Sequence, residues 1–312
     1  MKRLDASEQA IADIHWSPDG EWVSYTLGGE IRLANIKTDE IRIIGPGAYP
    51  RLTADHRVIF EKDGEILSAA AGSTKTLISR SDIVKDSPKG LPHLSPDSEI
   101  LLFCIYNVYD KTSQSLNAYP YRHFIGHSAA SGSKAAMTSQ QWYGGDMVWF
   151  ADGSRFVHFE FNSTAGPQIH IVRREDFSEE GKISGLYPSV SPDNRQIAAK
   201  PRNGGSLVVY STKGGWNDAD ITTSVVKIPV EKAARPSAVP PIWIDNRTLL
   251  VPEGDAVYRI DTKKDKAEIL KKLPMPTDRR KSSMVPSPDR EHLAVEVAVE
   301  AGFELRVIPT TA

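Results

Sequence analysis

The 312-residue sequence predicts an all-β protein in which one four-stranded unit is repeated seven times, and three observations support this prediction. A short turn of the form Ser-Pro-Asp-Gly returns seven times, with its aspartates 36 to 55 residues apart. The runs after each turn are rich in β-forming residues, and several alternate apolar and polar residues with a period of two. No long amphipathic helix is evident, which excludes helical repeats of similar length.

The turn chemistry favours hairpins. Proline presets the backbone for the second position of a type I turn, and aspartate accepts a hydrogen bond from the backbone two residues on. Glycine or asparagine then takes the positive φ that closes the turn. His56, Ser98 and Arg290 stand at that last position in three copies, so we expect those turns to be less regular. The seven aspartates are Asp19, Asp55, Asp97, Asp152, Asp193, Asp245 and Asp289.

The number of residues after the last turn predicts how the two ends of the chain meet. Only 23 residues follow Asp289, which is enough for two further strands and not for three. Residues 2–6 precede the first unit and are similar to an outer-strand segment, so we expect them to pair with the last unit and close a ring. Units of this length around one axis form a β-propeller.

We therefore predict a single domain, residues 1–312, folded as a seven-bladed β-propeller whose last blade is closed by the N-terminal strand. Six blades is the alternative, if the weak second unit is not a separate sheet. The predicted blades are approximately 11–46, 47–86, 87–142, 143–184, 185–238, 239–278, and 279–312 together with 2–8.

Four copies of the turn carry a family resemblance: "IHWSPDG" (14–20), "PHLSPDS" (92–98), "PSVSPDN" (188–194) and "VPSPDR" (285–290). They resemble the TolB-type propeller repeat, which is WD40-like but lacks the Trp-Asp signature. The resemblance implies the propeller fold, and it does not imply one function because the repeat is used in many contexts. The same repeat is similar to the propellers of prolyl-oligopeptidase-like enzymes and of oligogalacturonate lyase. No histidine set matches the metal centre of that lyase, so we predict no metal site.

The innermost strands of a propeller line its channel, so residues at matching positions in these strands are candidate ligand-binding residues. His15, Arg51 and His93 each stand four residues before the turn aspartate of three neighbouring units. Two imidazoles and a guanidinium at one level favour an anion or carboxylate site. Tyr49 and Tyr187 stand six residues before their aspartates, nearer the channel mouth, where they could stack on a ligand. The alternative is that these side chains are solvated by channel water or bonded to backbone.

Two insertions offer candidate partner-binding residues. Residues 107–133 include Tyr109, Tyr121 and His123, and aromatic residues mixed with small polar ones make good contact surfaces. Trp216 lies in a glycine-rich segment, where an exposed indole could anchor an interface. The alternatives are that the tyrosines pack on their own blade and that Trp216 is tucked against the rim.

Composition excludes several classes of protein. The formal net charge of −2 argues against a nucleic-acid partner, and no apolar run is long enough to cross a membrane. No signal peptide is visible, so the chain as given is expected to be cytoplasmic, or exported if a signal peptide was removed. We expect a monomer without a cofactor and without catalytic residues, which binds a protein or small ligand through the channel mouth and the inserted loops. The alternatives are a lyase or hydrolase acting in the channel on an anionic carbohydrate, and an accessory domain of a separate hydrolase.

Overall fold

The computed structural model describes most of the chain. The described residues are 2–70, 72–79, 92–106, 122–132, 134–137, 144–162, 166–217, 220–228, 239–253, 256–264, 267–272 and 284–310. In this part of the chain, 28 strands form seven four-stranded sheets, and no helix is present. It follows that the described residues include no helix that could cross a membrane.

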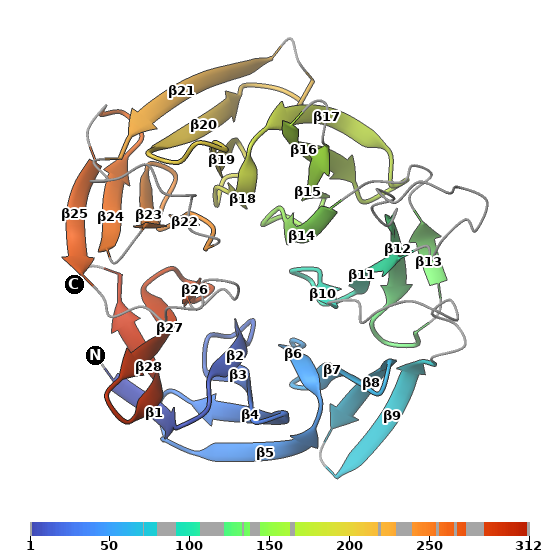
Figure 1. The fold of residues 1–312 in the computed structure, drawn as a ribbon. Helices are drawn as coiled ribbons and strands as arrows, with labels where there is room; N and C mark the ends of the chain where they lie inside the picture. Colours follow the sequence, from blue (N-terminus) through green and yellow to red (C-terminus); the bar gives the residue numbers. More distant parts are fainter. Residues whose placement is uncertain are drawn as a thin grey trace, which may run out of the picture.

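Each sheet begins with a strand beside the central axis and ends with a strand at the rim (Figure 1). The innermost strands are β2 (Ile11–Trp16), β6 (Ala48–Leu52), β10 (His93–Leu94), β14 (Gly144–Trp149), β18 (Leu186–Val190), β22 (Ile242–Trp243) and β26 (Met284–Pro286). The second strands are β3 (Trp22–Leu27), β7 (Val58–Lys62), β11 (Ile100–Tyr106), β15 (Arg155–Asn162), β19 (Gln196–Lys200), β23 (Thr248–Glu253) and β27 (His292–Val299). The third strands are β4 (Glu30–Asn35), β8 (Glu65–Ala70), β12 (Arg122–Ser128), β16 (Gly166–Arg173), β20 (Ser206–Thr212), β24 (Ala256–Asp261) and β28 (Gly302–Pro309). The outermost strands are β5 (Ile41–Pro46), β9 (Ser73–Ile78), β13 (Lys134–Met137), β17 (Glu179–Ser184), β21 (Ile221–Lys227), β25 (Ala267–Lys272) and β1 (Lys2–Ser7).

Seven sheets around one axis make a seven-bladed β-propeller, so the predicted fold class is confirmed. The weak second unit of the sequence forms a sheet of its own, β6 to β9, which excludes the six-bladed alternative. We number the blades from 1, beginning with the sheet β2 to β5.

Among the described residues, the hydrophobic core consists of seven clusters, and each cluster lies between two neighbouring blades. Between blades 1 and 2, for example, Trp22 and Ile31 pack with Val58 and Phe60. A blade in the ring is covered on both faces, and all six residues of β3 are buried as a result. Burial on both faces explains why such strands read as nearly continuous apolar runs instead of alternating ones.

The N-terminal strand closes the ring, as predicted. β1 pairs antiparallel with β28 and forms the outermost strand of blade 7 (Figure 1). The register of this pair shifts between Arg3 and Asp5. The Asp5 carboxylate accepts a hydrogen bond from the Tyr25 hydroxyl at 2.6 Å and another from Arg32 Nη1 at 3.4 Å. Because Tyr25 and Arg32 belong to blade 1, Asp5 ties the last blade to the first.

Six of the seven repeated turns are closed by the backbone hydrogen bond that their sequence predicts, whereas Asn246 of the sixth turn neither makes this bond nor adopts a positive φ. In blade 1 the Gly20 N–H donates to the Ser17 carbonyl at 3.0 Å, which closes the turn. Asp19 Oδ1 accepts hydrogen bonds from the Ser17 hydroxyl at 2.5 Å and from the Glu21 N–H at 3.0 Å. All of these partners lie within a few residues of one another, so the turn is a local property of the sequence.

His56, Ser98 and Arg290 adopt the same left-handed backbone as the glycines of the other turns, with φ of 60°, 61° and 65°. The expectation that these turns are less regular is therefore wrong. A left-handed residue with a side chain costs about 1–2 kcal/mol, and contacts with the preceding blade offset this cost. These contacts join His56 Nε2 to Asp19 Oδ2 (3.7 Å), the Ala54 N–H to Ser98 Oγ (3.2 Å) and Arg290 Nη1 to the Trp243 carbonyl (3.2 Å). The asparagines of two other turns make similar contacts with the preceding blade, Asn194 with Ala151 and Asn246 with Asp193.

Candidate functional site

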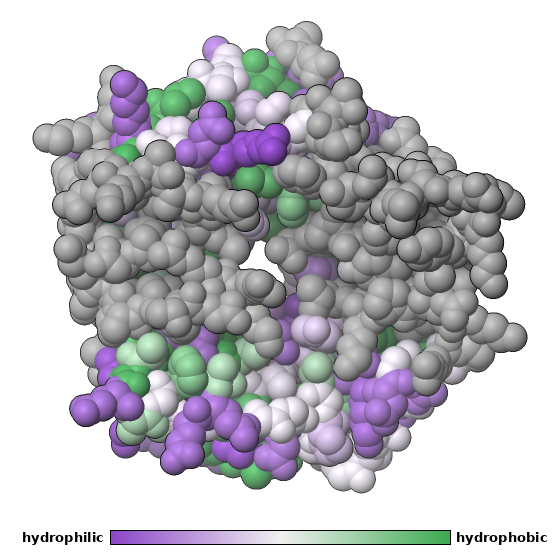
Figure 2. All heavy atoms as spheres, viewed as in Figure 1, coloured by the Kyte–Doolittle hydropathy of each residue, from purple (hydrophilic) through white to green (hydrophobic). Residues whose placement is uncertain are grey.

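Three of the predicted ligand-binding residues lie on the innermost strands of three neighbouring blades. His15 is on β2, Arg51 on β6 and His93 on β10. Figure 2 shows an opening through the centre of the molecule, where the innermost strands of Figure 1 converge. Burial has the largest effect on the pKa of the His15 and His93 imidazoles, and the charge of Arg51 has the second largest. His93 also lowers the pKa of His15. The structure therefore brings these three side chains close enough to interact electrostatically.

Arg51 is the fixed positive charge of this group. Its side chain is 9% exposed, and Nη1 donates a hydrogen bond to the Pro50 carbonyl at 2.9 Å. Burial lowers the pKa of Arg51 to about 10, and the nearby Asp13 acts in the opposite direction. The guanidinium thus remains charged at neutral pH. Among the described residues, no carboxylate lies within ion-pair distance of it, so its charge is available to an anion.

The two imidazoles are neutral at neutral pH. Burial and, next, the Arg51 charge lower the pKa of His93 to about 3. The same causes, with a contribution from His93, hold the pKa of His15 well below its ordinary value. Both residues remain partly exposed. A neutral imidazole has one N–H donor and one acceptor nitrogen, so each histidine can donate to an anion or accept a proton.

Asp13 was not among the predicted site residues, although it stands at the same repeat position as Tyr49 and Tyr187. All three have a left-handed backbone, with φ of 54°, 56° and 52°. Each lies where the pairing of its innermost strand shifts register, as a β-bulge does. Asp13 Oδ2 accepts a hydrogen bond from the Tyr49 N–H at 3.4 Å. Strained backbone of this kind is enriched at functional sites. The strain is a property of the folded backbone, so the sequence contained no signal that would have identified Asp13.

The two tyrosines differ in their surroundings. Tyr187 lies against Phe159 of the preceding blade, with ring centroids 6.0 Å apart and planes inclined by 51°. Tyr49 lies beside Asp13 of blade 1, whose carboxylate accepts a hydrogen bond from the Tyr49 N–H. Both side chains are partly exposed, so stacking on a ligand stays a prediction for each of them.

The predicted partner-binding residues have different outcomes. Trp216 is 2% exposed, lies edge-on to Phe150 with ring centroids 6.0 Å apart, and belongs to the core cluster between blades 4 and 5. The expectation of an exposed anchor at Trp216 is therefore corrected, because the indole is enclosed by residues of the preceding blade. Tyr109 and Tyr121 lie outside the described residues. His123 lies on β12, opposite Ile105 of β11.

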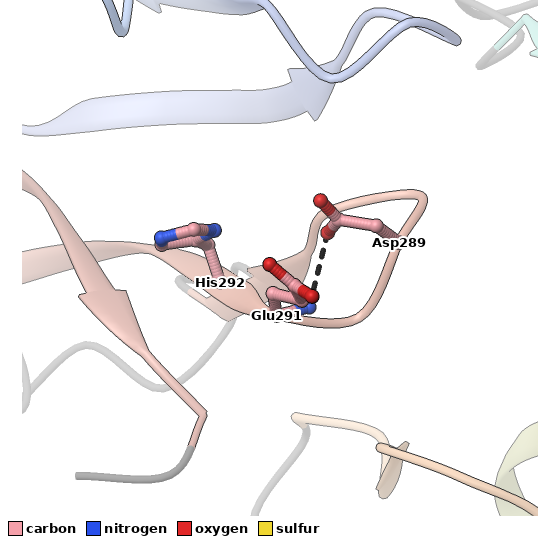
Figure 3. Close-up of side chains that lie close together, drawn as sticks. All are labelled: Asp289, Glu291 and His292. Atoms are coloured by element: carbon pink, nitrogen blue, oxygen red, sulfur yellow. Dashed lines mark hydrogen bonds between the residues drawn. The ribbon is translucent and has the colours of Figure 1, made fainter.

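Among the described residues, one group of side chains has ligand atoms close enough to hold a metal ion. It consists of Asp289, Glu291 and His292, whose ligand atoms lie within 4.8 Å of one another along one hairpin turn (Figure 3). Asp289 Oδ1 already accepts hydrogen bonds from the Ser287 hydroxyl at 2.5 Å and from the Glu291 N–H at 3.0 Å. Asp289 thus makes the same turn hydrogen bonds as Asp19, Asp97 and Asp193, and its proximity to Glu291 and His292 adds no evidence of a metal site.

The structure was compared with known proteins. No family model matches the sequence, and no curated protein matches it. Oligogalacturonate lyase from Vibrio parahaemolyticus superposes with a TM-score of 0.68 at 12% identity, over 99% of this chain and 93% of that chain. An oligogalacturonate lyase in complex with manganese superposes with a TM-score of 0.69 at 11% identity, over 99% and 93% of the two chains. These structures share the fold alone.

TolB from Acinetobacter baumannii is a further structural neighbour, at 14% identity over 98% of this chain and 56% of that chain. Its TM-score of 0.45 is too low to support an argument. The propeller fold is therefore shown, whereas the TolB-type origin of the repeat stays a prediction.

Proposed function

We propose that this propeller binds a small carboxylate-bearing ligand in its channel, through Arg51, His15 and His93. The observation that carries the proposal is the buried, charged guanidinium, which has no carboxylate within ion-pair distance among the described residues. A buried charge without a partner is costly, and an anionic ligand supplies that partner. The guanidinium presents several donors in one plane, which matches the two oxygens of a carboxylate.

The neighbouring groups favour a ligand that also carries hydroxyl groups. The neutral imidazoles of His15 and His93 offer both donors and acceptors beside Arg51. Asp13 adds a carboxylate near the guanidinium, and a carboxylate accepts hydrogen bonds from hydroxyls. With neutral histidines, Arg51 and Asp13 together leave the site without net charge, which disfavours a multiply charged anion, so the ligand carboxylate would gain its binding energy from direct hydrogen bonds to the guanidinium. A sugar acid combines one carboxylate with several hydroxyls and meets these requirements.

The test is isothermal titration calorimetry of the full chain with D-galacturonate, and with D-galactose as the matched neutral sugar. We expect the acid to bind at neutral pH and Arg51→Gln to weaken binding at least about tenfold, since a charge-assisted hydrogen bond contributes about 1.5–3 kcal/mol. Arg42→Gln is the control, because Arg42 is an exposed residue of β5 that pairs with Glu40. Equal affinity for both sugars, or unchanged affinity in folded Arg51→Gln, would reject the proposal.

A lyase acting in the same channel on an anionic carbohydrate is the second candidate, and the neutral state of the imidazoles favours it. A general base must be unprotonated at the working pH, as His15 and His93 are, and it must also have a pKa near that pH. A uronate bound to Arg51 would neutralise the charge that lowers the pKa of both imidazoles and so make them stronger bases. In an elimination, the base takes the proton from the carbon beside the uronate carboxylate while the bond to the leaving sugar oxygen breaks. Arg51 would stabilise the negative charge that develops on that carboxylate.

Incubation with oligogalacturonate tests the second candidate through the unsaturated product that elimination forms. The expected result is turnover by the unmodified protein and a loss of at least about a hundredfold in His15→Ala or His93→Ala, the usual size of a general-base contribution. If the uronate binds and no unsaturated product forms, the lyase candidate is rejected and the proposal of binding without catalysis is kept.

A further inference from the structure

A second cavity lies away from the channel, at the junction of blades 3 and 4. Its volume is about 500 Å³, within the range of small-molecule sites. Three guanidiniums line it, together with one carboxylate, two apolar side chains and a serine: Arg155, Arg173, Arg174, Glu175, Ile100, Phe177 and Ser154. Ile100 begins the second strand of blade 3, and the other six come from blade 4.

The cavity has a cause in the turn sequence. At most junctions, the last turn residue has a side chain that reaches the preceding blade, as described above for His56 and Ser98. In blade 4 this residue is Gly153, and a Cβ atom there would lie 3.4 Å from Arg174 Nη1. Arg174 takes over the contact by donating hydrogen bonds to Asp97 and Glu99 of blade 3. A long side chain from the next hairpin thus replaces a short one from the turn.

The three guanidiniums are held in place before any ligand arrives. Arg155 donates two hydrogen bonds to Glu180, at 2.5 and 3.2 Å. Arg173 donates to Ser178 and Asp176 of its own hairpin. Among the described residues, neither Nη1 of Arg173 nor Nε of Arg174 has a hydrogen-bond partner. Ordered donors lose little conformational entropy on binding, so these two groups are suited to a ligand oxygen.

The apolar part of the cavity is rigid as well. Phe177 is 3% exposed and packs on Phe156 with ring centroids 5.6 Å apart. Its backbone is left-handed, with φ of 55°, which is unusual for an aromatic residue and common at functional sites. Ile100 is partly exposed, and with the mostly buried Phe177 it forms the apolar side of the cavity, beside which a flat ring can lie.

The local charge decides which anion fits. The three arginines are accompanied by five carboxylates, which are Asp97, Glu99, Glu175, Asp176 and Glu180. This surplus of two negative charges opposes every anion and opposes a doubly charged phosphate ester most strongly. A single carboxylate is repelled least, and its binding would depend on the two remaining donors together with contact between its ring and the apolar side chains. We propose that the cavity binds a small aromatic carboxylate, with its ring beside Ile100 and Phe177 and its carboxylate on Arg173 and Arg174.

The test uses 2-naphthoate, its neutral counterpart 2-naphthamide, and inorganic phosphate, each titrated into the full chain by calorimetry. We expect 2-naphthoate to bind, and the amide and phosphate to bind at least about tenfold more weakly. Arg173→Gln removes an unused donor from a half-exposed side chain and should weaken naphthoate binding about tenfold. Ser154→Tyr places a ring at an exposed position of the lining and should abolish binding.

Two controls make the outcome decisive. Arg247→Gln changes a similarly exposed arginine of blade 6, paired with Asp261, and should leave binding unchanged. Thermal denaturation confirms that each variant is folded. The proposal is overturned if 2-naphthoate does not bind, or if folded Arg173→Gln and Ser154→Tyr bind it normally. Loss of binding in Arg51→Gln instead would assign the naphthoate to the channel, and would also overturn this proposal without affecting the proposed function.

Discussion

Replacing Asp5 with alanine should loosen the closure of the propeller ring. Asp5 accepts hydrogen bonds from the Tyr25 hydroxyl and from Arg32, both of blade 1, while its own strand belongs to blade 7. Tyr25 is fully buried, and burial followed by the Asp5 hydrogen bond raises the pKa of its hydroxyl. The neutral phenol is thus a donor that depends on Asp5 for its partner.

The size of the effect follows from these two contacts. Leaving the buried Tyr25 hydroxyl without an acceptor costs about 1–3 kcal/mol. The contact with Arg32 adds up to about 1 kcal/mol, because its side chain is 25% exposed and the distance is 3.4 Å. We therefore expect Asp5→Ala to lower the free energy of unfolding by about 1–4 kcal/mol. Asp5→Asn keeps an acceptor for Tyr25 and should cost about 1 kcal/mol.

The assay is urea denaturation followed by circular dichroism and tryptophan fluorescence, used where both signals give one transition. A double-mutant cycle with Tyr25→Phe isolates the hydrogen bond, and we expect a coupling of about 1–2 kcal/mol. Asp39→Asn is the control, because asparagine tolerates the left-handed backbone of Asp39 and only the exposed ion pair with Lys2 is lost, which should cost less than about 0.5 kcal/mol. A coupling near zero, or equal costs for Asp5→Ala and Asp39→Asn, would contradict this account of Asp5.

Two further predictions concern the blade interiors. His158 is fully buried and stacks on His170 with ring centroids 4.8 Å apart, and burial followed by the His170 charge holds the pKa of His158 well below its ordinary value. The folded state keeps His158 neutral, so below about pH 6.5 the unfolded chain binds an extra proton and stability falls by up to about 1.4 kcal/mol per pH unit. Urea titrations between pH 5 and pH 7 should show a flatter dependence in His158→Leu, and an unchanged slope would contradict this. Gly181→Ala should cost more than about 3 kcal/mol, because its Cβ atom would lie 1.7 Å from the Trp216 carbonyl oxygen. A Cβ atom at Gly29 would meet no other atom, and only the left-handed backbone, with a φ of 81°, disfavours alanine there. Urea melts of Gly29→Ala should therefore show a cost near 1 kcal/mol. Equal costs for the two glycines would count against the steric argument.

The candidate site was predictable in part. Because the turn aspartates set a common register, positions four residues before them identified His15, Arg51 and His93 from three separate blades. Asp13 occupies an equally regular position in the repeat. Its role depends on the β-bulge in its strand and on its proximity to Arg51, and neither can be read from the spacing of residues in the sequence. Trp216 shows the same limit, since the sequence left both an exposed and a tucked indole open, and only its contact with Phe150 of the preceding blade decides for the tucked position.

Most of the hairpin turns and the closing role of the first strand follow from the sequence, which also favours seven blades over six. These features depend on hydrogen bonds within a few residues, such as those of Ser17 and Asp19, or on how much chain follows the last turn. The folded structure was needed to exclude six blades and to establish the charge state of the channel histidines, the burial of Trp216 and the cavity beside Arg174. Burial and charge interactions depend on side chains from neighbouring blades, whose distances the linear order of residues does not specify.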